Sequence, residues 1–218
     1  MEFYKTLDHY IHGLNQEFDW ISPERKAQLE ALSSYIVQRL HSNQGVQLVV
    51  ICTHNSRRSH LGQIWLQLAA WFYNIAKVDT FSGGTEGTAF NPRAVAVLRR
   101  AGFEMWATEE QADNPFYQAV AGPAFFMNAL FSKAFDHPVN PSSEFGAIMV
   151  CAEADEACPI VTGAERRFAI RYEDPKHSDG SPEESAVYDE RCRQIAREAF
   201  YTMSKVKSML AVHHPPAP

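Results

Sequence analysis

The sequence predicts a three-layer α/β domain with a parallel sheet, and three observations lead to this fold class. Short apolar runs rich in β-branched residues alternate with longer segments of helical periodicity, an order that is typical of a parallel sheet. The first run, VQLVVI at 46–51, is almost continuously apolar, as expected of a strand covered on both faces. A polar turn and a helical segment follow it at once.

Two amphipathic helices are expected before this strand, over residues 4–18 and 23–42. Ser22 is positioned to cap the second helix, and Pro23 to occupy its first turn. A glycine-containing turn ends this unit. We therefore interpret residues 1–45 as an N-terminal helical extension of the α/β domain.

The segments after the first strand continue the alternation. A helical pattern covers residues 59–76, and VDTFSGGTE at 78–86 is expected to form a second strand that runs into a glycine-containing loop. Asn91-Pro92 opens a third helical pattern, which stops at Gly102 because glycine favours a helix end.

The C-terminal part is expected to complete the sheet. Four prolines and short aromatic pieces between residues 111 and 145 indicate an insertion of hairpin or irregular structure. The domain itself is expected to span 46–212, with residues 213–218 as a disordered tail. Its remaining elements are two strands and a long closing helix, at 145–151, 166–172 and 183–210.

The composition argues against several classes of function. A formal net charge of −6 over 218 residues argues against nonspecific binding to nucleic acid. No apolar run reaches the roughly 18 residues that span a bilayer, and the N-terminal stretch lacks the apolar core of a signal peptide. We therefore expect a cytoplasmic protein. In that reducing compartment its four cysteines, which form no CxxC pair for zinc, are expected to be catalytic or buried.

The stretch CTHNSRRS, residues 52–59, has the features of an oxyanion-binding loop. Cys52 ends the first strand and a helix begins near Ser59, so loop N–H groups and a helix N-terminus would surround a tetrahedral anion. Arg58 adds a forked contact, and this positive environment favours the thiolate of Cys52. Ser59 could donate to the sulfur. The alternative is a buried core cysteine beside solvated arginines. The expected oxyanion contacts are Thr53, His54, Asn55, Ser56, Arg57 and Arg58, with a solvated side chain as an equal alternative for Arg57.

This loop resembles the phosphate loop of the low-molecular-weight protein tyrosine phosphatases and of the thioredoxin-coupled arsenate reductases that share their fold. The match includes Asn55, the segment FSGGTE at 81–86 and Asn91-Pro92. It covers roughly residues 46–110 and 145–210. The resemblance implies a flavodoxin-like three-layer sandwich with a four-stranded parallel sheet, the phosphotyrosine protein phosphatase I fold.

The resemblance also gives a role to Asp174. A late Asp-Pro carries the general acid in this family, and here Asp174-Pro175 follows the strand expected at 166–172. Its implied role is to protonate the oxygen that leaves when Cys52 attacks, and a positioned acid contributes about 10²–10⁴-fold to such a step. Without the cysteine loop, Asp174 would be interpreted as a turn residue before proline.

Two further cysteines distinguish the two branches of the family. MVCAEADEACP, residues 149–159, is similar to the redox segment of the thioredoxin-coupled arsenate reductases. The resemblance implies that Cys52 attacks arsenate, that Cys151 then forms a disulfide with Cys52, and that Cys158 takes over this disulfide and passes it to thioredoxin. Taken singly, each of the two downstream cysteines is more readily interpreted as a packing residue.

Three functions therefore remain open. The leading one is a thioredoxin-coupled arsenate reductase. The second is a phosphomonoester hydrolase with Cys52 as nucleophile and Asp174 as acid, although Lys176-His177 stand where the family's phosphotyrosine phosphatases usually have a tyrosine. The third is a noncatalytic module that binds an oxyanion or a phosphoprotein. No tightly bound cofactor or metal is expected, and Gln63 stands where arsenate reductases often carry an acidic ligand for a monovalent cation.

Some residues remain outside this site. Cys192 lies in the closing helix without a matching motif and is interpreted as a packing residue, and His177 as an exposed loop residue. Aromatic residues of the insertion are expected to form local core, to cover the sheet or to provide the contact of a homodimer. They are Phe116, Phe125, Phe126 and Phe131.

Overall fold

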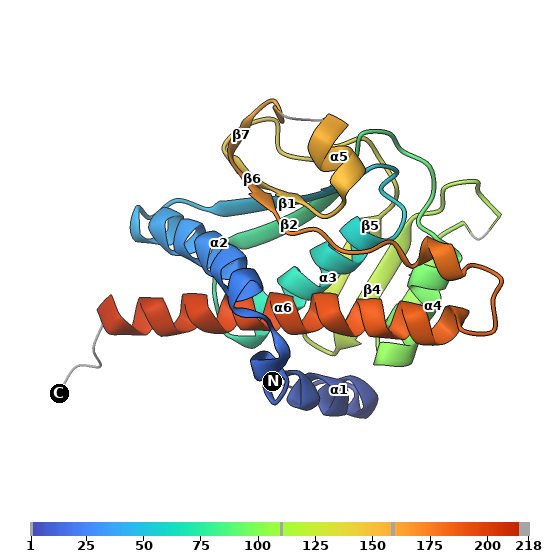
Figure 1. Cartoon of the computed structure of the whole chain (residues 1–218), viewed down its shortest axis with the longest axis horizontal. Coiled ribbons are helices and arrows are strands. Elements are labelled where there is room, and N and C mark those ends of the chain that lie inside the picture. Colours follow the sequence, from blue (N-terminus) through green and yellow to red (C-terminus); the bar gives the residue numbers. More distant parts are fainter. Residues whose placement is uncertain (1, 110, 158–159, 214–218) are drawn as a thin grey trace.

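A four-stranded parallel sheet forms the centre of the protein (Figure 1). The computed structural model describes residues 2–109, 111–157 and 160–213. The strands lie in the order β2-β1-β6-β7, and every neighbouring pair is parallel. The central strand β1 is buried along almost its whole length, which explains its continuous apolar sequence. The predicted fold class is confirmed. The strands are β1 (Val46–Cys52), β2 (Val78–Gly84), β6 (Phe145–Met149) and β7 (Ala164–Ala169).

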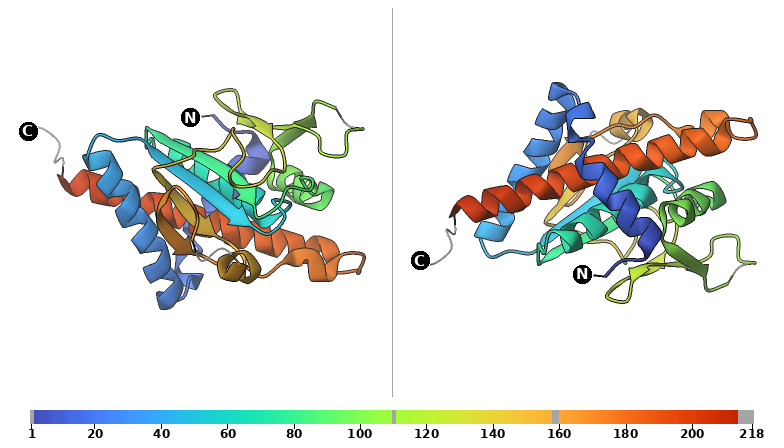
Figure 2. Two further views of the ribbon diagram at one scale, coloured as in Figure 1. Left: turned by 90° about the horizontal axis from the view of Figure 1, so that it is seen from above. Right: turned by 90° about the horizontal axis from the view of Figure 1, so that it is seen from below.

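Three long helices cover one face of this sheet, namely α2 (Pro23–His41), α3 (Arg58–Phe72) and α6 (Glu184–His213). The short helix α5 (Ala152–Ala157) contacts β1 and β6 and completes a three-layer arrangement. Figure 2 shows α6 crossing the helical face with α1 (Lys5–Asn15) packed against it. No helix in the described ranges is long and apolar enough to cross a bilayer.

The N-terminal helices share the core of the sheet. Leu7 and Ile11 of α1 and Leu32 of α2 are fully buried in the same apolar cluster as Val49 of β1 and Ile64 of α3. Ser22 caps α2 as predicted, because its side chain accepts a hydrogen bond from the N–H of Arg25. The 3-10 helix η1 (Phe18–Trp20) joins α1 to α2.

The insertion builds a second, antiparallel sheet of three strands, in the order β3-β4-β5. The hairpin expected between residues 111 and 145 is formed by β4 (Tyr117–Gly122) and β5 (Phe125–Leu130). The sequence analysis missed β3 (Glu104–Ala107), because this four-residue strand follows α4 (Pro92–Ala101) closely and shows no clear alternation.

Several observed boundaries differ by a few residues from the predicted ranges. Helix α3 ends at Phe72 because Asn74 turns the chain with a left-handed φ of 53°. Strand β2 ends at Gly84. Strand β7 covers Ala164–Ala169, although the N–H groups of Ile170 and Tyr172 still donate to carbonyls at the end of β6 and just after it.

The outer edge of β2 is closed by side chains of α3 and by the insertion. Gln67 accepts a hydrogen bond from the N–H of Thr80 at 2.9 Å, and Gln63 donates to the carbonyl of Thr80 at 3.0 Å. Further along, Gly84 donates to the carbonyl of Lys133 at 2.9 Å and accepts from the N–H of Phe135 at 2.8 Å. The chain that leaves the hairpin therefore lies beside the carboxyl end of β2, next to the predicted oxyanion loop.

Candidate active site

The loop of residues 53–57 directs its carbonyl groups outward. The carbonyls of Cys52, Thr53, His54 and Ser56 all accept hydrogen bonds from neighbouring segments. In contrast, no protein acceptor is found among the described residues for the N–H groups of residues 53–56. Donors without protein partners at the start of α3 make a nest that suits an anion. The groups that bind the carbonyls come from Thr85, Glu86, Thr88, Asn91 and Ser132.

Two local features allow this conformation. Asn55 has a left-handed φ of 43°, which asparagine tolerates better than most residues. Its side chain donates to Ser59 Oγ at 2.8 Å and accepts from the N–H of Lys133 at 2.9 Å. Gly84 lets the loop approach β2, because a Cβ there would lie only 2.6 Å from the carbonyl oxygen of Thr53.

Cys52 lies at the base of this nest and is 4% exposed. Its Sγ is 3.0 Å from the Oγ of Ser59, which is fully buried. Because Ser59 Oγ already accepts a hydrogen bond from Asn55, its own hydrogen is free to point at the sulfur. The structure therefore places a hydroxyl donor directly against the sulfur of Cys52.

Arg58 and Asp174 form an ion pair beside the loop. Arg58 Nη2 lies 2.5 Å from Asp174 Oδ2, and its Nη1 donates to the carbonyl of Tyr172 at 2.8 Å. Asp174 also begins the 3-10 helix η2 (Pro175–Ser178), since its Oδ1 accepts from the N–H of Lys176 at 3.0 Å. The structure therefore shows the turn role, one of the two alternatives for Asp174, and also places its carboxylate beside Arg58; the role as general acid stays a prediction. His177 is exposed, as expected.

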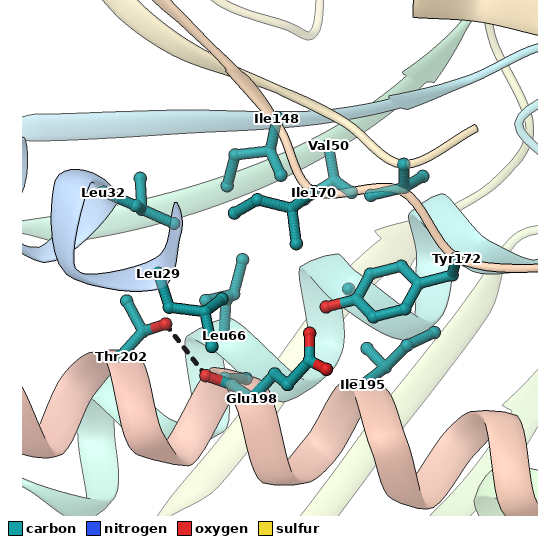
Figure 3. Close-up of a pocket in the computed structure, with 13 residues that line it drawn as sticks. Leu29, Leu32, Val50, Leu66, Ile148, Ile170, Tyr172, Ile195, Glu198 and Thr202 are labelled. Atoms are coloured by element: carbon teal, nitrogen blue, oxygen red, sulfur yellow. Dashed lines mark hydrogen bonds between the residues drawn. The ribbon is translucent and has the colours of Figure 1, made fainter. Parts of the chain in front are cut away.

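Tyr172 holds the chain segment that leads to Asp174. Figure 3 shows its ring in a cavity between α2, the sheet and α6, with its hydroxyl directed toward Glu198. Burial raises the pKa of Tyr172 and that of Glu198. This cavity holds about 20 Å³, room for a single water-sized molecule, so it is no substrate site.

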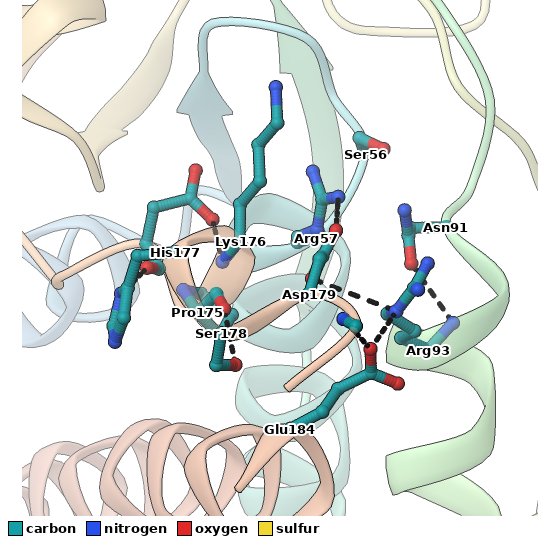
Figure 4. A network of polar contacts seen from close by, with 12 residues as sticks. Ser56, Arg57, Asn91, Arg93, Pro175, Lys176, His177, Ser178, Asp179 and Glu184 are labelled. Atoms are coloured by element: carbon teal, nitrogen blue, oxygen red, sulfur yellow. Dashed lines mark hydrogen bonds and ion pairs between the residues drawn. The ribbon is translucent and has the colours of Figure 1, made fainter. Parts of the chain in front are cut away.

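The side chain of Arg57 is engaged in a polar network (Figure 4). Its Nε donates to the hydroxyl of Tyr188 at 2.7 Å, and its Nη2 to Asp179 Oδ2 at 3.0 Å. Arg93 and Glu184 belong to the same network, with Arg93 Nε 2.8 Å from Glu184 Oε2. The solvated alternative for Arg57 is therefore wrong, because the side chain joins the loop to the C-terminal segments.

Cys151 lies next to the loop. It is fully buried, and its Sγ is 3.4 Å from the Oγ1 of Thr53, the residue that follows Cys52. Burial raises the pKa of Cys151, and the hydrogen bond with Thr53 opposes that shift. Cys158 lies outside the described residues. Cys192 is buried and accepts a hydrogen bond from the indole N–H of Trp65 at 3.2 Å, which agrees with a packing role.

The helix that follows Cys151 is tied to β7 and the segment after it. Asp155 on α5 is almost completely buried, and its carboxylate pairs with Arg167 and Arg171. The bond from Arg171 Nε to Asp155 Oδ2 measures 2.8 Å. The chain between the two predicted redox cysteines is therefore anchored through one buried carboxylate.

Sequence reasoning missed Ser132 and Lys133, which support the loop from the insertion. Ser132 Oγ donates to the carbonyl of His54 at 3.0 Å, beside the contact of Lys133 with Asn55. Nothing in the spacing of the insertion signals these contacts. No group of three or more His, Cys, Asp or Glu residues suited to a metal is found in the part of the chain that the structure describes.

Two known proteins are similar to this chain in sequence. No family model matches the chain. The arsenate reductase of Bacillus licheniformis is 25% identical over 146 residues, which is 66% of this chain and 84% of that protein. The arsenate reductase of Halalkalibacterium halodurans is 23% identical over 155 residues, which is 71% of this chain and 92% of that protein.

A solved structure has the same fold. A mutant of YwlE from Bacillus subtilis superposes with a TM-score of 0.50 at 12% identity, covering 75% of this chain and 99% of that one. A low-molecular-weight phosphotyrosine phosphatase from Vibrio cholerae O395 superposes with a TM-score of 0.48 at 13% identity, covering 79% and 100%. The two relatives found by sequence support the predicted resemblance to the arsenate reductases, and the YwlE structure shows the shared fold.

Proposed function

We propose that the protein is a thiol-dependent arsenate reductase that transfers a disulfide from Cys52 through Cys151 and Cys158 to thioredoxin. The observation that carries this proposal is the second thiol at the loop, with Cys151 Sγ 3.4 Å from Thr53 Oγ1. A phosphatase of this fold needs no thiol there. The sequence similarity to two arsenate reductases supports the same choice.

The first step is attack of Cys52 on the arsenic of a bound arsenate. The N–H groups of residues 53–56 and the guanidinium of Arg58 hold the oxygens, while Ser59 stabilises the thiolate. A sulfur–arsenic bond forms and one arsenic–oxygen bond breaks. Asp174 gives its proton to the departing oxygen, which leaves as water.

The second step reduces arsenic. The thiolate of Cys151 attacks Cys52 Sγ, so that a disulfide forms and the sulfur–arsenic bond breaks. The electron pair of that bond remains on arsenic, which leaves as arsenite, and the two cysteine sulfurs are oxidised together. Thr53 assists because its hydroxyl can donate to the attacking thiolate of Cys151.

The last steps restore the enzyme. Cys158 attacks Cys151 and releases Cys52 as a thiolate, which takes the disulfide to Cys151 and Cys158. The dithiol of thioredoxin then reduces this disulfide and becomes oxidised itself. No other cofactor is required by this scheme, and a cytoplasmic location suits its reducing partner.

The alternative function is hydrolysis of a phosphomonoester. Cys52, Ser59, Arg58 and Asp174 have the same contacts in either reaction, so they would form and hydrolyse a phosphocysteine without the other thiols. Lys176 is exposed at the start of η2, two residues after Asp174, and it carries a charge and no aromatic ring. This favours an anionic ester over a phosphotyrosine side chain.

The test compares two assays on one protein preparation. NADPH oxidation is measured with arsenate, thioredoxin and thioredoxin reductase, and release of p-nitrophenol from its phosphate ester is measured separately. Cys151→Ser and Cys158→Ser should each abolish arsenate-dependent turnover, whereas Cys192→Ala, a matched control in the core, should retain it. Turnover that survives Cys158→Ser contradicts the cascade. Ester hydrolysis without arsenate reduction, unchanged in Cys151→Ser, favours the alternative.

A further inference from the structure

Lys133 is a buried cation whose backbone binds the oxyanion loop at Asn55. It is 5% exposed, and its ammonium donates to the carbonyl of Phe131 at 3.2 Å and lies 4.7 Å from the ring centroid of the same residue. No carboxylate among the described residues forms an ion pair with it. Burial lowers the pKa of Lys133 to about 8, so the ammonium form still dominates at neutral pH.

The backbone of Lys133 fixes its position relative to the catalytic loop. Its N–H donates to Asn55 Oδ1 at 2.9 Å, and its carbonyl accepts from Gly84 at 2.9 Å. His60, the residue after Ser59, is fully buried, and its Nδ1 lies 3.3 Å from the hydroxyl oxygen of Ser82 on β2. Burial lowers the pKa of His60 well below its usual value, and the charge of Lys133 adds to this effect.

An uncompensated buried charge is costly, and the groups around Lys133 do not neutralise it. Phe131 offers a carbonyl and a ring face, and His60 is kept neutral by its surroundings. The negative charges that the loop is built for are the Cys52 thiolate and a bound oxyanion. Such a cation is complementary to a loop that holds two or three negative charges.

We propose that Lys133 is a positioning residue whose charge raises the affinity of the loop for a dianionic tetrahedral oxyanion. The insertion thus supplies part of the anion site although its side chains do not enter the loop. The inference rests on the proposed function only in requiring that the loop binds an oxyanion, and it holds for a reductase and a phosphatase alike.

The structure allows the charge to be separated from the backbone contacts. Lys133→Met keeps the N–H and carbonyl that bind Asn55 and Gly84 and removes only the ammonium. Lys77→Met is the matched control, because Lys77 is exposed beside Asn43 at the opposite end of β2. Binding of inorganic phosphate is measured by calorimetry and by protection of Cys52 from iodoacetamide.

Lys133→Met should bind phosphate about tenfold more weakly than the wild-type protein, while Lys77→Met should bind it equally well. Lys133→Ala should also bind phosphate weakly, and added ammonium or methylammonium should restore its affinity for phosphate. The cleft that Lys133 lines between α3, β2 and β5 gives a small cation access. A purely structural role would not produce such rescue.

The outcomes are distinguishable. If the wild-type protein binds phosphate and Lys133→Met binds it equally, the inference is wrong and the proposed function stands. If the wild-type protein binds neither phosphate nor arsenate, the proposed function fails and the inference fails with it. If Lys133→Met does not fold, Lys133→Gln carries the same comparison, and weaker binding without rescue of Lys133→Ala contradicts the electrostatic role.

Discussion

Asp174 Oδ2 lies 2.5 Å from Arg58 Nη2, so the expected proton donor and the expected anion ligand hold one another. Nη2 carries two N–H groups, so a bound oxyanion can share this nitrogen with the carboxylate, and two negative charges then lie close together. The ionised carboxylate of Asp174 and the anion therefore compete for the charge of Arg58.

Asp174→Asn should separate these two uses. Turnover should fall by about 10²–10⁴-fold because the proton donor is lost. Phosphate should bind more tightly, since the amide competes less well than a carboxylate for Arg58. Calorimetry and steady-state kinetics on one preparation measure both effects. Glu173→Gln is the control, because Glu173 is an exposed neighbouring carboxylate paired with Arg191. Weaker phosphate binding in Asp174→Asn would show that the carboxylate helps to form the anion site.

Thr53→Val should separate reduction from hydrolysis. The change keeps the shape of the side chain and the carbonyl contacts of Thr53, and it removes the hydroxyl 3.4 Å from Cys151. Arsenate-dependent NADPH oxidation should fall by about tenfold, the usual effect of one hydrogen bond to a charged group. Hydrolysis of p-nitrophenyl phosphate should not change. Thr85→Val is the control, because it removes a hydroxyl that donates to the carbonyl of Thr53 and leaves the hydroxyl of Thr53 in place. An equal loss in both assays would mean that Thr53 serves the loop and not Cys151.

Asp155→Asn should loosen the chain that begins at Cys151. The amide pairs weakly with Arg167 and Arg171, both partly exposed and able to reach water. Backbone amides of α5 should exchange hydrogen faster, with a local opening free energy lower by about 1–2 kcal/mol. A disulfide between Cys151 and Cys158 should also form faster. Asp189→Asn, which loses an exposed ion pair with Arg100, is the control. Unchanged exchange in α5 would exclude Asp155 as its anchor.

Lys133 should make stability depend on pH in a defined window. Its pKa is about 8 in the folded protein and 10.5 in the unfolded chain, so the unfolded chain binds more protons between these values. The cost of burying the ammonium, about 3 kcal/mol, is full below pH 8 and disappears as the pH rises toward 10.5. Lys133→Met should therefore unfold at higher urea than the wild-type protein at pH 7, and the gap should close near pH 10. A difference in urea midpoint that stays constant over this pH range would mean that the two proteins differ in packing and not in the cost of a buried charge.

The parts of the site that lie close together in the sequence could be predicted. The loop from Cys52 to Ser59 joins one strand to one helix, so its position at the carboxyl edge of the sheet follows from local order. Asp174 required the family resemblance, because a turn before proline alone has many uses. Its contact with Arg58 places it beside the loop, and its role as proton donor stays a prediction.

The remaining parts depend on segments that meet only in the folded chain. Lys133 reaches Asn55 across 78 residues, through an insertion whose pairing with β2 no local pattern indicates. Arg57 was assigned to the anion or to solvent, but its partners Asp179 and Tyr188 lie more than a hundred residues away. Strand β3 was missed because its four residues are stabilised by β4.

The glutamine side chains along β2 have a consequence for the protein in a crowded cell. An unprotected edge strand invites pairing with another chain and is a common start of aggregation. Here the amides of Gln63 and Gln67 already bind Val78 and Thr80, and residues 133–135 bind Gly84. A second chain therefore finds no continuous ladder along β2. The contacts that hold the loop from one side also keep this edge of the sheet from growing.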